Sequence, residues 1–238
     1  MNPPETLTAK SLRALKWNYL GTVGRVVLQF GSQIALARLV GPDATGVFAY
    51  AFLTVGLCAL VVEMGLGAAL VQAPELSDQA LATVCGRLLS AGALAALVLY
   101  ACADALAQHV LSAPQAAPVL RAMAPSLMIA AAMFPATAVL KRQIEFKVIQ
   151  ISELASYVVG YVFVGITAAW YGWGEWSLVL AWYTQTGLAC LLLYLKAPRS
   201  LKPGNPLRAL SLAGFGLVVM FTNMLNWTIE YGTHLLIG

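Results

Sequence analysis

Seven long apolar stretches follow one another along the chain, and short breaks containing Gly, Pro or charged residues separate them. The stretches cover residues 14–40, 45–72, 79–108, 117–140, 149–171, 176–196 and 207–238. At about 1.5 Å per residue, roughly 20 residues suffice for a helix to cross about 30 Å of hydrocarbon, and each stretch is long enough. Apolar and polar residues do not alternate with a period of two, as the strands of a membrane barrel require. The pattern therefore predicts an all-α fold, a polytopic transmembrane helix bundle.

Proline and aspartate residues predict local features of these helices. Asp43, directly after Pro42, is placed to cap the second helix. Pro125 and Pro135 lie inside the fourth segment, where the missing N–H and the bulky ring should kink the helix.

The composition excludes a water-soluble domain. Hydrophobic residues make up 60% of the 238 residues and charged residues only 10%, and the mean hydropathy is +0.78. The four cysteines lie in apolar runs without a C-x-x-C pair, and the two histidines lack partners at ligand spacing. We therefore expect no metal site, no cofactor and no enzymatic activity, because an enzyme needs convergent acid, base or metal groups.

The basic residues predict the orientation, since Lys and Arg in short loops stay on the cytoplasmic side. With the N-terminus inside, only Arg38 and Arg121 lie outside. The loop and helix-end residues on the inner side are Lys10, Arg13, Lys16, Arg87, Lys141, Arg142, Lys147, Lys196, Arg199, Lys202 and Arg208. The net charge of +4 thus reflects membrane topology, and no nucleic-acid partner is expected.

A short internal repeat suggests how the helices are grouped. Residues 30–37, FGSQIALA, align with residues 231–238, YGTHLLIG, as an aromatic, a Gly, a hydroxyl, a polar and four small or apolar positions. The repeat predicts a six-helix N-terminal lobe over residues 1–206 and a seventh helix, 207–238, that starts an incomplete second lobe. Many transporters are built from such repeated lobes around a central pathway.

Four segments resemble one family in combination. They are Ala37–Phe48 (ARLVGPDATGVF), Glu63–Gln72 (EMGLGAALVQ), Leu140–Lys147 (LKRQIEFK) and Gly172–Val179 (GWGEWSLV). Together they are similar to Wzx-type polysaccharide and lipopolysaccharide flippases of the MOP exporter superfamily, and the similarity extends over nearly the whole chain.

The resemblance implies a two-lobed bundle in the bacterial cytoplasmic, or inner, membrane. Its substrate would be an undecaprenyl-pyrophosphate-linked oligosaccharide, moved between leaflets by alternating access, with membrane lipid, a second lobe or polysaccharide assembly proteins as partners. Family members usually have twelve to fourteen spans, so a chain with seven departs from them in length and leaves an inactive truncated fragment as an alternative. A drug/cation antiporter of the same superfamily is the other alternative, which needs acidic residues within a lobe.

Arg25 is the leading candidate for substrate binding, because a charge inside a membrane helix is costly and usually faces a partner or a water-filled path. Its guanidinium matches phosphate oxygens with a two-pronged fork. Glu63 gives an alternative: Arg25 lies 18 residues before Asp43 and Glu63 lies 20 after it, so the two side chains reach similar depths on antiparallel neighbours. A structural ion pair and a phosphate contact both remain open.

Amides and a second polar pair complete the candidates. Gln29, Gln33, Asn223 and Asn226 are expected to line a sugar path, since amides hydrogen-bond hydroxyls, although hydrogen bonding between helices explains them equally well. Glu230 and His234 lie four residues apart on one helix face, which suits a proton-coupled site or, alternatively, an outer polar patch.

Overall fold

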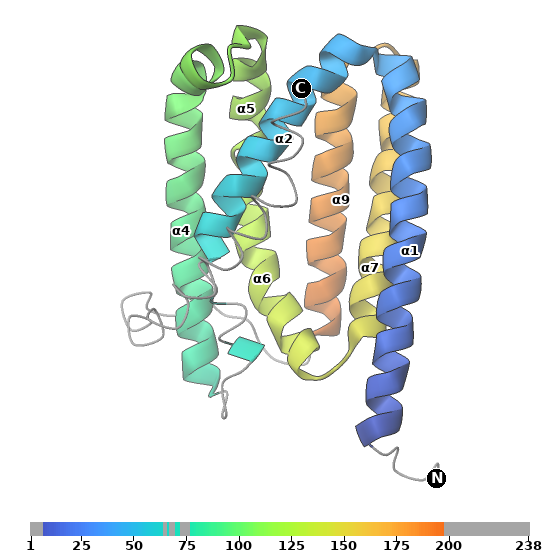
Figure 1. The fold of residues 1–238 in the computed structure, drawn as a ribbon. Helices are drawn as coiled ribbons and strands as arrows, with labels where there is room; N and C mark the ends of the chain where they lie inside the picture. Colours follow the sequence, from blue (N-terminus) through green and yellow to red (C-terminus); the bar gives the residue numbers. More distant parts are fainter. Residues whose placement is uncertain (1–6, 64–65, 67–69, 72–76, 198–238) are drawn as a thin grey trace.

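The computed structural model describes residues 7–63, 66, 70–71 and 77–197, and throughout these residues the only regular structure is helical. Figure 1 shows long helices packed side by side. The α-helices are α1 (Leu7–Val40), α2 (Pro42–Glu63), α4 (Asp78–Ala105), α5 (Ala117–Met123), α6 (Ser126–Arg142), α7 (Phe146–Tyr157), α8 (Ile166–Trp170) and α9 (Glu175–Lys196). Two π-helices, η1 (Leu106–Val110) and η3 (Val158–Gly165), extend α4 and α7, and a 3-10 turn, η2 (Pro114–Ala116), precedes α5.

The first six predicted segments correspond to these helices, and the predicted all-α membrane bundle is confirmed. Four stretches are long and apolar enough to cross a membrane: Pro42–Glu63, Leu81–Val110, Phe146–Trp170 and Glu175–Lys196. A fifth span is formed if the bent pair Pro114–Met123 and Ser126–Arg142 is counted as one. The predicted seventh helix, 207–238, lies outside the described residues.

Helix α1 differs from the prediction for residues 14–40, because its composition does not place it among the apolar spans. It has ample length, 34 residues. Arg25, Gln29 and Gln33 lower the mean hydropathy of its central part. The same residues that make α1 functionally interesting therefore weaken its signal as a span.

The fourth predicted segment is bent where proline interrupts it. Its two parts meet at 45°, with Pro125 between them. The kink predicted at Pro125 is confirmed, whereas α6 continues as one helix through Pro135. Pro135 is buried, so its ring packs within the bundle.

The turn between α1 and α2 depends on one glycine. Gly41 has φ of +90°, a conformation that costs a residue with a side chain more than it costs glycine. The hydroxyl of Thr45 donates to the Gly41 carbonyl oxygen at 2.7 Å. Because α2 already begins at Pro42, Asp43 lies in the first turn and not at the predicted cap position. Its negative charge there still interacts favourably with the positive end of the helix dipole.

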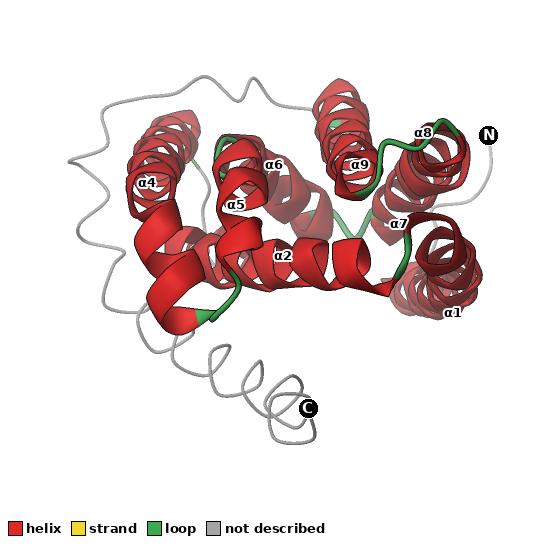
Figure 2. Ribbon diagram, turned by 90° about the horizontal axis from the view of Figure 1, so that it is seen from above, coloured by secondary structure: helices red, strands yellow, loops and turns green. Residues whose placement is uncertain are grey.

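The helices run alternately between two ends of the bundle. Helices α1, α4 and α7 begin at the lower end in Figure 1, and α6 and α9 end there, whereas α2 starts at the upper end and stops near middle height. Helix α2 does not run parallel to the bundle axis: it starts beside the end of α1 and crosses diagonally towards α4 (Figures 1 and 2). Its contacts accordingly involve α4, α5 and α6 as well as α1.

Buried apolar side chains fill the bundle in two main clusters. The larger joins α2, α4, α5, α6, η3 and α9 through residues such as Phe48, Leu99, Leu127 and Leu178. The smaller joins α2, α4 and α6 through Val62, Leu88 and Val139.

The π-helix η3 packs closely against α9 at two glycines. A Cβ on Gly160 would lie 2.7 Å from the carbonyl oxygen of Ala181, and one on Gly165 would lie 3.0 Å from the Ala181 Cβ. Small residues let membrane helices approach in this way. This contact anchors the upper part of the α7–η3–α8 span, against which α1 rests.

Candidate functional site

An ion pair joins α1 to α7 in the middle of the bundle: Nη1 of Arg25 donates to Oε2 of Glu153. By the helical rise, Arg25 lies about 22 Å below Val40 at the upper end of α1. Glu153 lies about 10 Å above Phe146, where α7 begins. Both charges are therefore well inside the span and away from either end.

The two helices run in the same direction along a polar seam. Three contacts rise together along both chains: Gly21 with Gln150, Arg25 with Glu153, and Ser32 with Tyr157. We call these six residues the α1–α7 seam. The contacts are four and seven residues apart on α1 and three and four residues apart on α7, spacings that keep them on one face of each helix.

Above the ion pair, the seam is closed by a buried hydrogen bond. The hydroxyls of Ser32 and Tyr157 lie 2.6 Å apart, and the two residues are 5% and 2% exposed. Ser32 also donates to the carbonyl oxygen of Leu28 at 2.8 Å. The ring of Tyr157 stacks on that of Tyr161, with centroids 4.8 Å apart.

Below the ion pair, the seam is closed by packing against a glycine. A Cβ on Gly21 would lie 2.7 Å from the Cβ of Gln150, so a larger residue has no room there. Between these two closed points, the Arg25 and Glu153 side chains remain 34% and 24% exposed. The ion pair is thus held by its neighbours yet accessible.

The structure corrects the expected partner of Arg25. The sequence placed Glu63 opposite it, but α2 tilts away from α1 as it descends and carries Glu63 towards α4 and α6. The cation that acts on half-buried Glu63 is Lys141, at the end of α6. Beside it, Arg142 donates to the carbonyl oxygens of Leu70 and Val71 at 3.3 and 3.4 Å. The described neighbour of Glu63 with opposite charge is therefore Lys141 of α6, and Arg25 pairs elsewhere.

Gln29 and Gln33 extend the polar stripe of Arg25 along α1. The three residues are spaced by four, and both amides are exposed. The neighbouring stripe on the same helix is apolar and exposed, with Val26, Phe30 and Ile34. Helix α1 therefore has an exposed apolar stripe suited to contact with lipid, and beside it a stripe of polar groups at membrane depth.

Four of the predicted site residues lie outside the described residues. They are Asn223, Asn226, Glu230 and His234. Whether they approach Arg25 stays a prediction.

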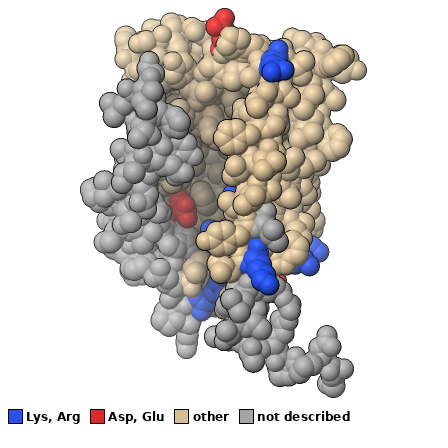
Figure 3. All heavy atoms as spheres, turned by 45° about the vertical axis from the view of Figure 1, so that its right-hand side comes forward, with Lys and Arg blue, Asp and Glu red and all other residues tan. Residues whose placement is uncertain are grey.

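Charged side chains are distributed unevenly over the surface. Figure 3 shows a recess in one face, with acidic and basic atoms visible inside it at middle height. Most other basic atoms in this view lie at the lower end. At the upper end, Arg121 pairs with Asp104 and so ties α5 to α4. This second pair is 40% and 52% exposed, in keeping with a position near the membrane surface.

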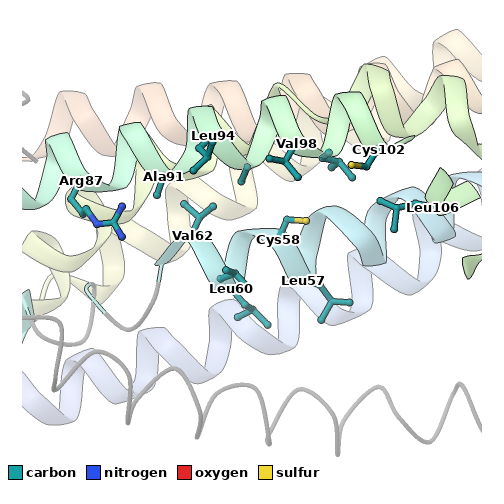
Figure 4. A pocket seen from close by; sticks show the side chains of 13 residues that line it. Leu57, Cys58, Leu60, Val62, Arg87, Ala91, Leu94, Val98, Cys102 and Leu106 are labelled. Atoms are coloured by element: carbon teal, nitrogen blue, oxygen red, sulfur yellow. The ribbon is translucent and has the colours of Figure 1, made fainter. Parts of the chain in front are cut away.

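An apolar pocket lies apart from the ion pair, between α2 and α4 (Figure 4). Its volume is about 550 Å³, and residues such as Leu57, Val62, Leu94 and Val98 line it, with Arg87 at one end. Of the residues predicted for substrate binding, the described ones, Arg25, Gln29, Gln33 and Glu63, do not line this pocket. Within the described part of the chain, no group of three His, Cys, Asp or Glu side chains is arranged to hold a metal ion.

Glu153 is the site residue that the sequence analysis missed. It lies in the predicted segment 149–171 and is acidic within an otherwise apolar run, the same signal that singled out Arg25. Applying that signal to every segment would have found it. The pairing itself joins residues 128 apart in sequence, and no spacing rule reveals such a contact.

The sequence is similar to those of known proteins of one family. The model of a family described as "Polysaccharide biosynthesis protein" matches residues 35–238. The chain belongs to this family. The matched region contains α2 to α9 and the end of α1, including Glu153, while Arg25 lies just before it.

One curated relative of this polysaccharide biosynthesis family member is the succinoglycan biosynthesis transport protein ExoT of Rhizobium meliloti (strain 1021). The two are 29% identical over 219 residues. The match covers 90% of this chain but 44% of the relative, so the chain spans less than half of the relative's length. No solved structure matches the chain.

Proposed function

We propose that this multi-pass membrane protein is the N-terminal lobe of a flippase that carries a lipid-linked oligosaccharide across the bacterial cytoplasmic membrane for polysaccharide biosynthesis. The observation that carries the proposal is the accessible Arg25–Glu153 pair at membrane depth in a member of this family. The transport protein similar to it supports movement of a saccharide over its chemical conversion.

The physical reason concerns the cost of moving the substrate. A diphosphate and several sugars must cross hydrocarbon, where each unsatisfied polar group costs several kcal/mol. Arg25 supplies a cation for the diphosphate, and Gln29 and Gln33 supply amides along the same stripe for hydroxyl groups. The polar stripe would line the pathway and the apolar stripe beside it would face lipid.

The mechanism that we propose is alternating access with a second lobe. Two lobes that rock about a central cavity expose the Arg25 stripe first to the inner and then to the outer side. The concentration of basic residues at the lower end of the bundle supports a cytoplasmic N-terminus. Asn223, Asn226, Glu230 and His234, on the predicted seventh helix, would contribute from the side of the second lobe.

A drug/cation antiporter of the same superfamily is less well supported. Such a protein needs an acidic residue free to bind a cation, and the carboxylate of Glu153 is neutralised by Arg25. Altered sensitivity to drugs or dyes on expression of the chain would favour the antiporter.

The test is complementation of a flippase-deficient bacterium, following surface polysaccharide and accumulated lipid-linked precursor together. The wild-type chain is expressed alone and with a separately expressed second lobe, and Arg25→Ala is compared with Arg25→Lys. We expect cleared precursor with the wild type, loss with Ala and partial retention with Lys, with equal membrane insertion of all three. Equal clearance by Arg25→Ala would remove Arg25 from the mechanism.

A further inference from the structure

We infer that Glu153 is a positioning and specificity-determining residue: it holds Arg25 ready in the membrane and competes with the anionic group of the substrate for it, so that a diphosphate binds reversibly. This inference rests on the proposed function. It goes beyond it by assigning Glu153, which contacts Arg25 and not the substrate, a role in both selection and release.

The geometry leaves room for a ligand beside the ion pair. A guanidinium has five N–H donors. Among the described residues, Arg25 uses one nitrogen, Nη1, in its contact with Oε2 of Glu153. With 34% of the side chain exposed, a phosphate oxygen can approach the remaining donors before the ion pair breaks.

The charge balance makes Glu153 a competitor. At rest the pair carries no net charge, which suits a position inside the membrane. When a diphosphate diester with two negative charges reaches Arg25, the carboxylate becomes a third negative charge at the same place. Like charges repel strongly where water is scarce, so Glu153 lowers the affinity of Arg25 for every anion. A singly charged anion that makes one contact with Arg25 competes poorly with Glu153. A diphosphate that makes two hydrogen bonds to the guanidinium competes best.

Competition of this kind serves transport because a carrier must release what it binds. Without Glu153, Arg25 would be an unopposed cation at membrane depth, and a diphosphate bound there would dissociate slowly. With Glu153 present, the ion pair with Arg25 forms again as the anion dissociates.

The seam keeps this exchange local. Ser32 with Tyr157 above, and Gly21 with Gln150 below, hold α1 against α7 on both sides of the ion pair. The exchange of partners therefore does not require the helices to separate. For the same reason, replacing the carboxylate by an amide should alter ligand binding more than folding.

The experiment measures binding to the purified 238-residue chain in lipid nanodiscs. Farnesyl diphosphate is the probe, and farnesyl monophosphate and farnesol report on charge and on the apolar chain alone. Equilibrium affinity and dissociation rate are measured for wild type, Glu153→Gln, Arg25→Ala and the double variant. Asp104→Asn is the matched control, because it neutralises the carboxylate of the other ion pair, at the end of the membrane span.

We expect Glu153→Gln to bind farnesyl diphosphate at least about tenfold more tightly and to release it more slowly, since one nearby like charge shifts such equilibria by a factor of ten or more. Binding of farnesol should not change. Arg25→Ala should abolish the preference for diphosphate, and adding Glu153→Gln to that variant should not restore it. Asp104→Asn should match the wild type, and Glu153→Asp should stay closer to the wild type than Glu153→Gln.

The outcomes separate this inference from the proposed function. If Arg25→Ala weakens diphosphate binding while Glu153→Gln leaves it unchanged or weakens it, Glu153 only supports the fold and the inference is wrong. If the wild type binds farnesyl diphosphate no better than farnesol, recognition of the diphosphate by this lobe is itself refuted, and the role of Glu153 falls with it.

Discussion

The hydrogen bond between Ser32 and Tyr157 predicts an asymmetry between two mutations that remove the same contact. Ser32 is placed to donate to the carbonyl oxygen of Leu28, so we expect the tyrosine hydroxyl to be the donor in its contact with Ser32. In Tyr157→Phe, the Ser32 hydroxyl loses a donor but keeps its own acceptor. In Ser32→Ala, the tyrosine hydroxyl, on a side chain only 2% exposed, keeps its proton and loses its acceptor.

The magnitudes follow from these two situations. An intramolecular hydrogen bond contributes about 0.5–1.5 kcal/mol to stability, and hydrogen bonds between membrane helices average about 0.6 kcal/mol. Leaving a buried donor unsatisfied costs about 1–3 kcal/mol. We therefore expect Tyr157→Phe to lower the free energy of unfolding by about 0.5–1 kcal/mol and Ser32→Ala by about 1–3 kcal/mol.

The assay is reversible unfolding of the purified chain in mixed micelles with increasing mole fraction of SDS, followed by helical circular dichroism. The double variant tests the cause, because removal of both hydroxyls leaves no unsatisfied donor. It should be no less stable than Ser32→Ala alone. A larger loss for Tyr157→Phe than for Ser32→Ala, or fully additive losses, would refute this account of the seam.

Three further predictions test other parts of the structure. Gly160→Val should destabilise the chain by about 1–3 kcal/mol in the same assay, because its side chain would meet the backbone of Ala181 at η3. Asp104→Asn should cost less than about 1 kcal/mol, since the pair with Arg121 is exposed, and a larger loss would mean that the pair ties α4 to α5 more strongly than its exposure suggests. In a background without the four native cysteines, Trp173→Cys should react with an impermeant maleimide in intact cells and Lys147→Cys only after lysis; the reverse pattern would invert the proposed orientation.

The sequence predicted the helices well because membrane helices carry their signal locally. Length, apolarity and breaks at Gly and Pro located every described span, and Pro125 marked the one sharp bend. The predicted cap at Asp43 was wrong by two residues, because Pro42 begins the helix and the cap position is Gly41. Such errors arise where two capping signals are adjacent.

The site was harder to predict because its contact depends on helix tilt. Counting residues from a turn gives the depth of a side chain but not its distance from a neighbour, and α2 diverges from α1 below the turn. Glu63 was therefore considered as a partner of Arg25, whereas Glu153, on a parallel helix far along the chain, makes the contact. The two π-helices were also absent from the predictions, since no simple sequence period distinguishes them from α-helix.

The distance of 128 residues between Arg25 and Glu153 has a consequence for how the protein is made. At synthesis rates of about 5–20 residues per second, Arg25 leaves the ribosome roughly 6 to 26 seconds before its counterion. During that interval α1 carries an unopposed charge and, by composition, is not among the helices apolar enough to span. We expect α1 to wait at the membrane interface and to take its final depth only once α7 has been inserted.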